Sequence, residues 1–390
     1  MKKTLAIVLL GAWSIGMAAQ KGIEKLQWKT VATKMPKEWY ASQQAAEVAE
    51  QVMHCQLPKG GWPKNIAFHK QLNEVVISEM QATGIGGTFD NRATTTEMRF
   101  LAKMYVHTKR DAYKQAFVRG LDYIFEAQYD NGGWPQFYPV RPSKKIHYSA
   151  HITYNDNAMV NVMLLLRDVY QEKGDMARLA LGDSLKLRAK KAFDRGVECI
   201  VNTQIVVDGV PTVWCAQHDE HTLEAAPARA YELESYSGDE SAGILMLLMQ
   251  IDHPTPQVVR AVRCGVEWMK NHTIKNTRVE RYREENGEKN VRLVPAPGHD
   301  VWARFYDLQT AKPFVCDRDG VKKASLQEIG RERRCGYSWY VEEPAKMLER
   351  YEQWERQLAK KHVSGNTASA TCPPIICIGA SERIKKCYLR

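Results

Sequence analysis

The chain has 390 residues, a formal net charge of +10, 44% hydrophobic residues and 26% charged residues. This length and composition fit one large globular domain or two smaller ones, and no linker divides the sequence. The basic balance fits nucleic acid, an acidic polysaccharide or simple solubility. Because no helix-turn-helix, zinc-finger or RNP-type signature is present, we expect no nucleic-acid partner.

The two ends of the chain differ from the rest. Residues 1–19 (MKKTLAIVLLGAWSIGMAA) combine a basic start, an apolar centre and a small-residue exit, which is the layout of a secretory signal. We therefore expect an exported protein, periplasmic or secreted, without stable membrane insertion. Residues 363–390 lack helical periodicity and are predicted to be a disordered tail, so residues 20–362 are expected to form a single domain.

A loop motif recurs along the chain. It reads QLPKGGWP from Gln56, QYDNGGWP from Gln128 and, more loosely, QIVVDGVP from Gln204. Such a period indicates stacked copies of one supersecondary unit, here a helix, a long loop and a second helix. We expect a ring of helical hairpins whose long loops gather on one face.

Apolar residues at three- and four-residue spacing predict helices in chain order. The expected ranges are 41–54, 94–107, 112–128, 157–172, 184–203, 239–251, 256–271 and 340–360. Two of these helices contain AMVNVMLLLRDVY and SAGILMLLMQI, which are apolar on most faces and should line the centre of the ring. Strand signals are sparse and predict a hairpin within TQIVVDGVPTVWCAQ and a short pair between RLVPAP and RFYDL.

The second helix of each predicted hairpin opens with an acid, namely Asp90, Asp156 and Asp239. An Asp at a helix start often accepts backbone N–H bonds as a cap. Amides accompany two of these acids, Asn91 in the first motif and Asn155 in the second. Carboxylate and amide oxygens that converge are hard ligands suited to Ca²⁺. Both interpretations, helix caps and calcium ligands, are open at this point.

Three arginines, Arg229, Arg304 and Arg318, lie in short loops crowded with aromatic or acidic residues. A planar guanidinium grips a carboxylate with two bonds, so a substrate that carries carboxylates would use such residues repeatedly. The alternative is an internal ion pair, as for Arg318 between Asp317 and Asp319.

Other residue types allow further interpretations. His218 and His221 near Asp219 suggest zinc, but the sequence offers no matching third ligand. The Trp and Tyr residues of GGWPKN, NGGWPQFYP and GYSWY are either sugar-stacking platforms or loop anchors. Serine-nucleophile, P-loop and dinucleotide motifs are missing from the sequence.

The order of the motifs resembles the family-10 polysaccharide lyases, the pectate lyases with an (α/α)₃ toroid. The matching motifs, from about residue 35 to 355, are GGWPKN, TFDNRATTTEM, NGGWPQFYP, ITYNDNAMVNVM, VWCAQHDEHTLEAAPARAYELES, WARFYDL, CDRDG and GYSWY. The resemblance implies a fold dominated by α-helices, a toroid of helical hairpins with long loops and a few short strands. It also implies a secreted, monomeric pectate lyase that cleaves α-1,4-polygalacturonate by calcium-assisted β-elimination and releases 4,5-unsaturated oligogalacturonates.

The resemblance assigns roles residue by residue. It implies calcium binding by Asp156, Asp90 and Asn155, substrate binding by Arg229, Arg304, Asp90 and Tyr337, and the role of catalytic base for Arg318. A guanidinium ordinarily keeps its proton, with a pKa above about 12. If Arg318 stays charged, it would instead stabilise the developing negative charge, and a lysine or hydroxide would take the proton.

Two other functions are compatible with these residues. A hydrolase of uronic-acid glycans would need a general acid and a second carboxylate, for which Glu232, Glu234 and Asp239 are candidates. A non-catalytic acidic-glycan binding protein would depend on Arg229 and Arg304 and would lose nothing on Arg318→Ala.

Overall fold

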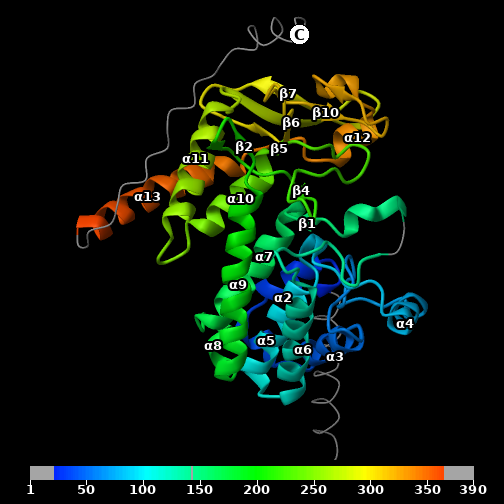
Figure 1. Ribbon diagram of the computed structural model, residues 1–390. Coiled ribbons are helices and arrows are strands. Elements are labelled where there is room, and N and C mark those ends of the chain that lie inside the picture. Colours follow the sequence, from blue (N-terminus) through cyan, green and yellow to red (C-terminus); the bar gives the residue numbers. More distant parts are fainter. Residues whose placement is uncertain (1–21, 142–143, 364–390) are drawn as a thin grey trace, which may run out of the picture. The chain divides into compact units, whose positions relative to one another are not determined.

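The structure is a computed structural model that describes residues 22–141 and 144–363 (Figure 1). The predicted signal segment and all but the first residue of the predicted tail lie outside the described residues. The chain divides into two compact units. Described residues 22–130, 134–141 and 161–195 form the first unit, and 131–133, 144–160 and 196–363 form the second. The single domain expected over residues 20–362 stays a prediction.

Helices build most of the first unit. They are α2 (Trp28–Lys34), α3 (Gln43–His54), α4 (Glu74–Thr83), α5 (Thr95–Thr108), α6 (Asp111–Ala127) and α8 (Asp175–Arg178), with the 3-10 turns η1 (Lys37–Ala41) and η2 (Asp90–Arg92). Helix α5 packs against α2, α3 and α6, and Figure 1 shows α5 and α6 side by side. Their apolar residues at helical spacing, such as Phe100 and Met104 on α5 and Phe117 and Leu121 on α6, are fully buried.

Two long helices have residues in both units. They are α7 (Ala158–Tyr170) and α9 (Asp183–Thr203). Most of the apolar side chains of α7, from Met159 to Val169, are buried, as its sequence predicts.

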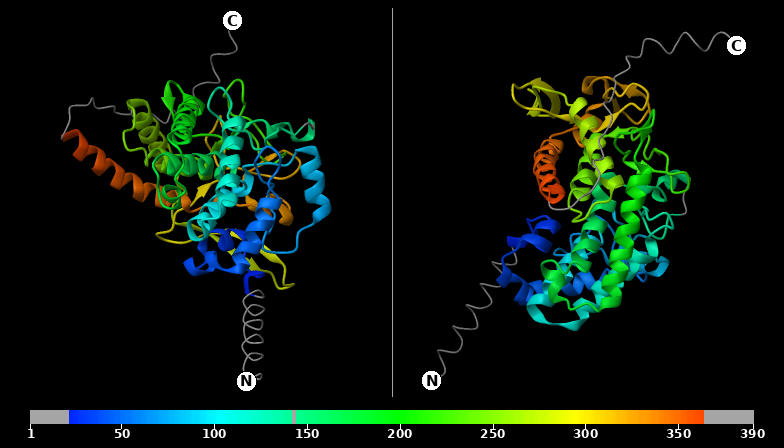
Figure 2. Two further views of the ribbon diagram at one scale, coloured as in Figure 1. Left: turned by 90° about the horizontal axis from the view of Figure 1, so that it is seen from below. Right: turned by 60° about the vertical axis from the view of Figure 1, so that its left-hand side comes forward.

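The second unit holds four further helices and all twelve of the described strands. The helices are α10 (Gly238–Leu248), α11 (Pro256–Asn271), α12 (Arg331–Gly336) and α13 (Glu343–Val363), with the 3-10 turns η3 (Lys144–Ser149), η4 (Asn155–Asn157) and η5 (Leu326–Glu328). Helices α10 and α11 pack together, and the long helix α13, drawn in red, packs against both (Figure 2). None of the helices in the described residues is long and apolar enough to cross a membrane.

The strands form short antiparallel pairs. They pair as β1 (Ile152–Thr153) with β4 (Gln217–His218), β2 (Val206–Val207) with β3 (Val210–Pro211), β5 (Tyr236–Ser237) with β9 (Phe305–Tyr306), β6 (Thr277–Arg283) with β7 (Lys289–Pro295), β8 (Trp302–Ala303) with β12 (Tyr340–Val341), and β10 (Val315–Cys316) with β11 (Lys322–Lys323). The hairpin predicted in TQIVVDGVPTVWCAQ is confirmed as β2–β3.

The predicted pair between RLVPAP and RFYDL is wrong. The first segment belongs to β7, which pairs with β6, and the second contains β9, which pairs with β5. The EENGE turn explains the difference, because Gly287 (φ 80°) lets β6 and β7 close a local hairpin. The sequence of β6 (TRVERYR) is highly charged, so its hydrophobic pattern does not predict a strand.

The eight predicted helices are confirmed, and no boundary differs from the expected one by more than three residues. The recurring Gln explains the repeat. In each copy this Gln follows the first helix, and its side-chain amide donates to a backbone carbonyl of a later helix (α6, α9 or α11). The bonds join Gln56 to Ala116 (2.9 Å), Gln128 to Ala192 (2.8 Å) and Gln204 to Ala261 (3.0 Å).

Each loop also holds a fully buried tryptophan whose indole N–H donates to a carbonyl of the preceding helix. The bonds join Trp62 to Val52 (2.7 Å), Trp134 to Ile124 (2.8 Å) and Trp214 to Ile200 (2.7 Å). These tryptophans are therefore loop anchors and not sugar-stacking platforms. The third copy keeps the anchor although its sequence departs from GGWP.

Candidate functional site

The residues predicted from the sequence fall in both units. Asp90 belongs to the first unit, and the second contains Asn155, Asp156, Arg229, Arg304, Arg318 and Tyr337. Within the second unit, a chain of ion pairs, hydrogen bonds and ring contacts connects these six residues.

The β1–β4 pair positions Asn155 and Asp156. Beyond this pair, the backbone N–H groups of Tyr154 and Asn155 both donate to the carbonyl of Ala216, at 2.9 Å each. The chain then turns through η4, where Asp156 takes a left-handed backbone (φ 51°, ψ 29°). Asp and Asn adopt this conformation more readily than other residues with a Cβ, and such positions cluster at functional sites.

Asp90 caps no helix, because its Oδ2 pairs with Lys64 and its Oδ1 has no hydrogen-bond partner. Helix α5 begins at Thr95 without a side-chain cap, and Asp156 lies within η4 before α7 begins. In the third copy the cap of α10 is Ser237, whose Oγ accepts from the N–H of Glu240 at 3.2 Å. The capping interpretation is therefore wrong for Asp90, and the side-chain cap of α10 is Ser237 and not Asp239, which lies in the first turn of that helix.

Arg304 is the buried centre of the site. It lies between β8 and β9, where its N–H donates to the carbonyl of Trp339 at 2.8 Å and its own carbonyl accepts from Gly238 at 3.1 Å. Its Nη2 donates to Asn155 Oδ1 (3.1 Å), to Asp156 Oδ1 (3.2 Å) and to Glu240. Only 5% of the Arg304 side chain is exposed, whereas 41% of that of Asp156 is. Arg304 thus holds Asp156 at an accessible edge.

The acids around Arg304 outnumber it. Burial, followed by the charge of Glu240, raises the pKa of Asp239 to about 7. Burial lowers the pKa of Arg304, but the charge of Glu240, with smaller contributions from Asp239 and Asp156, outweighs it and raises the pKa well above its usual range. One guanidinium therefore faces three carboxyl groups, and the excess negative charge favours an additional cation.

Asp156 supplies the exposed carboxylate at this edge, and oxygens of Asn155 and Glu240 lie buried behind it around Arg304. Such carboxylate and amide oxygens are the ligand chemistry of a hard divalent ion such as Ca²⁺. In the structure, the acids around Asp156 do not form a complete coordination sphere. Among the described residues, one group, His151, Asp219 and Glu220, brings three His, Cys or acidic ligand atoms within 4.8 Å of one another. A cation at Asp156 would therefore need further oxygen ligands, which a substrate carboxylate or water can supply.

Tyr337 joins Arg304 to the other arginines. The Arg304 guanidinium lies 4.7 Å from the centre of the Tyr337 ring, and the guanidinium groups of Arg229 and Arg333 each lie 5.9 Å from it. The Tyr337 hydroxyl donates to Glu232 Oε1 at 2.8 Å. Burial raises the pKa of Tyr337 well above its usual range, so this hydroxyl stays protonated and acts as a donor.

Arg229 and Glu232 form a two-pronged ion pair. Arg229 Nε donates to Oε2 at 2.7 Å and Nη2 donates to Oε1 at 2.5 Å. Burial lowers the pKa of Arg229, but the bonds to Glu232 outweigh it, so the pKa of Arg229 is raised above its usual range. The Arg229 side chain is 45% exposed. Glu232 occupies this fork, so a substrate carboxylate would contact the exposed remainder of the charged guanidinium.

Arg318 lies further along the same network. Its Nη2 contacts both carboxylate oxygens of Glu332, at 3.3 and 3.4 Å, and Glu332 also accepts from Arg333 at 2.6 Å. The Arg318 side chain is 67% exposed. Its surroundings therefore differ from the desolvated site that would help a guanidinium to lose its proton. The internal pairing expected from the sequence exists, but with Glu332 and not with Asp317 or Asp319.

Asp90 is buried in the first unit. Its N–H donates to Thr88 Oγ1 at 3.1 Å, and its Oδ2 pairs with Lys64, which lies 5.4 Å from the ring centre of Phe137. The other carboxylate oxygen, Oδ1, is buried without a hydrogen-bond partner. A buried carboxylate oxygen without a hydrogen bond destabilises the free protein, and it can accept a cation or a hydroxyl donor.

His218 and His221, the histidines for which the sequence offered no third zinc ligand, do not form a metal site with Asp219. His218 is fully buried, its Nδ1 is bonded to the carbonyl of Leu223 at 2.9 Å, and its Nε2 accepts from the N–H of Cys215 at 3.1 Å. Burial lowers the pKa of His218 to about 4. Because both ring nitrogens are engaged, His218 is a structural residue.

Sequence reasoning missed three members of the network, Glu240, Glu332 and Arg333. Glu240 directly follows Asp239 in SYSGDES, and that adjacent acid was the available signal. Glu332 and Arg333 lie in RERRCG, whose sequence looks like an ordinary charged helix surface and contains no signal of a functional site.

Comparison with known proteins identifies the class of protein. The sequence matches the family described as pectic acid lyase over residues 56–348. The structure is similar to two structures of the family 10 polysaccharide lyase from Cellvibrio cellulosa, with 32% sequence identity and a TM-score of 0.70 for each. The first, a mutant in complex with trigalacturonic acid, aligns over 84% of this chain and 95% of its own, and the second over 82% and 95%. Among curated proteins the comparison finds no match.

These matches define the protein as a polysaccharide lyase and confirm the predicted fold class, the (α/α)₃ toroid of the family 10 lyases. The chain belongs to the pectic acid lyase family, and its enzyme class is that of a pectate lyase. This assignment takes the place of the hydrolase and the non-catalytic binding protein that the sequence also allowed.

Proposed function

We propose that this pectate lyase is exported and cleaves α-1,4-polygalacturonate by calcium-assisted β-elimination, releasing 4,5-unsaturated oligogalacturonates. The observation that carries the proposal is the network around Arg304 and Tyr337. It combines an exposed edge of oxygen donors at Asp156 with guanidinium groups at Arg229 and Arg318. A polymer with one carboxylate on every sugar suits such a surface.

The reaction needs these residue types. A base removes the proton from the carbon next to the carboxylate, the electron pair forms the new double bond, and the bond to the leaving sugar oxygen breaks. The main barrier is the negative charge that builds on the carboxylate as the proton leaves. Arg229, which keeps its charge, would bind a carboxylate and stabilise this charge, while Arg304 fixes Asp156 and Asn155 in place.

Asp156 and Asn155 are the proposed calcium ligands of the second unit, and Asp90, with its unpartnered oxygen, is proposed as a ligand or substrate contact from the first. When bound, Ca²⁺ would act as a Lewis acid on the uronate carboxylate. The positive balance of the chain supports an anionic polymer as substrate. We also propose that the enzyme acts as a monomer.

For the base we propose Arg318, the assignment that the resemblance implies. The contact between Arg318 and Glu332 would have to open when substrate binds, because an ion pair favours the charged guanidinium. Arg229 is the alternative base, and its ion pair with Glu232 would have to open in the same way. It is partly exposed and lies over the same Tyr337 ring as Arg304, whereas Arg318 is connected through Glu332 and Arg333. Because an arginine base requires deprotonation, we expect an alkaline pH optimum.

The deciding experiment incubates the purified protein with polygalacturonate and follows the ultraviolet absorbance of the unsaturated product, with and without excess EDTA. We expect product to accumulate, EDTA to stop it and added Ca²⁺ to restore it. New reducing ends without ultraviolet absorbance would indicate hydrolysis and contradict the proposal. Undiminished cleavage in EDTA would contradict the role of calcium, and an acidic optimum would contradict the arginine base.

A further inference from the structure

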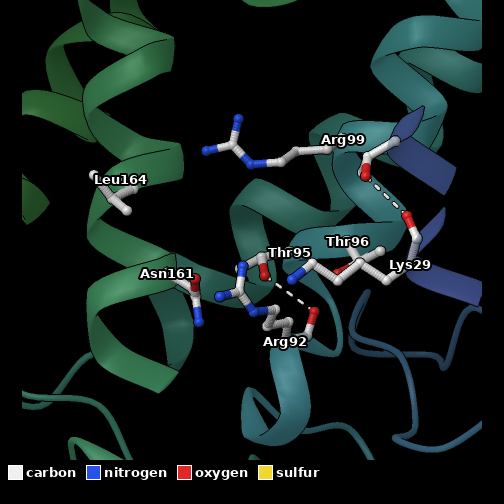
Figure 3. A pocket seen from close by; sticks show the side chains of 8 residues that line it. Lys29, Arg92, Thr95, Thr96, Arg99, Asn161 and Leu164 are labelled. Carbon is white, nitrogen blue, oxygen red and sulfur yellow. Dashed lines mark hydrogen bonds between the residues drawn. The ribbon is translucent and has the colours of Figure 1, made fainter. Parts of the chain in front are cut away.

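The first unit contains a small cationic pocket at the start of α5 (Figure 3). Its volume is about 260 Å³, and three cations line it, Lys29 from α2, Arg92 from η2 and Arg99 from α5. Thr95 and Thr96 of α5 and Asn161 of α7 also line it. Figure 3 shows Lys29 and Arg92 converging beside Thr95, with Arg99 above them.

The positive charge of this pocket is only partly balanced. Arg99 Nη2 pairs with Asp168 at 2.8 Å. Neither Lys29 nor Arg92 forms an ion pair with any acid in the part of the chain that the structure describes. Burial, followed by the charge of Arg92, lowers the pKa of Lys29, as expected where two cations converge without an acid between them. An anion in the pocket would relieve this repulsion.

The other donors also favour an anion. The side-chain nitrogen of Asn161, Nδ2, is buried and donates to no acceptor. Thr95 is the first residue of α5, a helix of 14 residues, so the positive end of the helix dipole adds to the charge of the side chains. Three independent features therefore point to one ligand chemistry: surplus cations, an unsatisfied buried donor and a helix N-terminus.

The backbone at Arg92 is held in an unfavourable conformation. Its φ is 65°, in the left-handed region that glycine adopts without strain and that side chains with a Cβ rarely adopt. The pocket thus retains a guanidinium at a position where glycine would be the more stable choice. A ligand that needs this charge would account for it.

We propose that this pocket is an anion site that binds one uronate sugar through its carboxylate, separate from the network around Arg304. Pockets of roughly 300–1,000 Å³ hold drug-sized ligands, so about 260 Å³ suits a single sugar unit or an inorganic oxyanion. The carboxylate would contact Lys29 and Arg92, and Asn161 would donate to it. The choice of a uronate rests on the proposed function, since a lyase of polygalacturonate meets this sugar at high concentration.

The test measures binding of D-galacturonate, D-galactose and inorganic phosphate to the full chain by calorimetry in EDTA. We expect galacturonate to bind, galactose, which lacks the carboxylate, not to bind, and Arg92→Gly to weaken galacturonate binding at least tenfold. Arg92→Gly should fold well, because it removes the strained side chain. Lys29→Gln should weaken binding as well. Lys109→Gly is the matched control, since it removes a cation from a left-handed position (φ 58°) at the other end of α5.

Three outcomes would overturn the proposal: galacturonate binding that Arg92→Gly and Lys29→Gln leave unchanged, equal binding of galactose, or Arg92-dependent binding of phosphate alone. Product formation from polygalacturonate is measured in parallel to separate this site from the lyase function. An inactive protein with Arg92-dependent galacturonate binding would refute the proposed function and keep the site. If the protein is an active lyase and Arg92→Gly does not change galacturonate binding, only the proposed anion site is refuted.

Discussion

Arg304 holds Asp156 through a contact of 3.2 Å between Nη2 and Oδ1, and the same nitrogen contacts Asn155 and Glu240. The guanidinium of Arg304 is therefore already bound to carboxylates of the protein when a substrate carboxylate arrives. Its principal effect is to orient the acids that would hold calcium. Arg229, whose side chain is 45% exposed, is better placed to bind substrate.

The first prediction concerns this buried guanidinium. Arg304→Gln leaves Asp156, Asp239 and Glu240 without their counter-charge, and breaking a buried ion pair typically destabilises a protein by about 3–5 kcal/mol. We expect a clear fall in Tm by calorimetry together with loss of lyase activity. Arg278→Gln, which removes an exposed arginine of β6, is the control and should leave Tm nearly unchanged. Equal Tm values for both variants would show that Arg304 does not hold the acids together.

The second prediction locates the calcium. Asp156→Asn keeps the shape of the side chain and removes its charge, so the Ca²⁺ concentration for half-maximal activity should rise about tenfold or more. The matched variant is Glu220→Gln, in the group with His151 and Asp219, which should keep the wild-type calcium requirement. Activity is titrated with Ca²⁺ after EDTA treatment. If Glu220→Gln shifts the titration and Asp156→Asn does not, the calcium ligands have been assigned to the wrong acids.

The third prediction separates the base from the substrate clamp. General base catalysis contributes roughly 10²- to 10⁴-fold, so Arg318→Ala should lower kcat by such a factor with little change in KM. Arg229→Ala should mainly raise KM, because it removes a carboxylate contact. Steady-state kinetics on polygalacturonate, with circular dichroism to check folding, distinguish the two. The reverse pattern would make Arg229 the base.

The fourth prediction uses the buried acid Glu97 of the first unit, which accepts from the indole of Trp28 at 2.7 Å. Burial raises its pKa from 4.5 to about 7 in the folded protein. The folded state therefore binds the proton more tightly, and the stability from this group is present below pH 4.5 and is lost as pH rises to about 7. A shift of this size corresponds to about 3 kcal/mol.

Glu97→Gln cannot ionise but keeps an acceptor for Trp28. Relative to wild type it should gain up to about 3 kcal/mol of unfolding free energy between pH 4.5 and pH 8. Urea unfolding at several pH values measures this difference. A difference that stays constant across this range would mean that Glu97 titrates normally.

The fifth prediction tests the bonds that join the repeats. Gln204 is buried and donates to the carbonyls of Thr212 (2.8 Å) and Ala261 (3.0 Å). Gln204→Leu leaves both carbonyls without this donor, which should destabilise the protein by about 1–3 kcal/mol. Gln257→Leu on the exposed start of α11 is the control and should change little. Equal unfolding free energies for the two variants would rule out a structural role for the recurring glutamine.

The eight predicted helices, the repeat and the family could be inferred from the sequence alone. Apolar spacing along one helix is a local property, and the recurring Gln marks each copy because it bonds to the next one. The order of the motifs was enough to indicate a pectate lyase. The ion-pair partners of Asp156, Arg229 and Arg318 could not be predicted from the sequence.

Contacts between distant parts of the chain establish which charged side chains lie together. Arg304 lies 148 residues after Asp156 along the chain and reaches it because two short strand pairs, β5–β9 and β8–β12, fix the position of its loop. The structure also separated the buried Arg304 from the exposed Arg318, although both lie in similar aromatic and acidic sequence. Burial and ion pairing arise from contacts between distant segments, and no local pattern of residues records them.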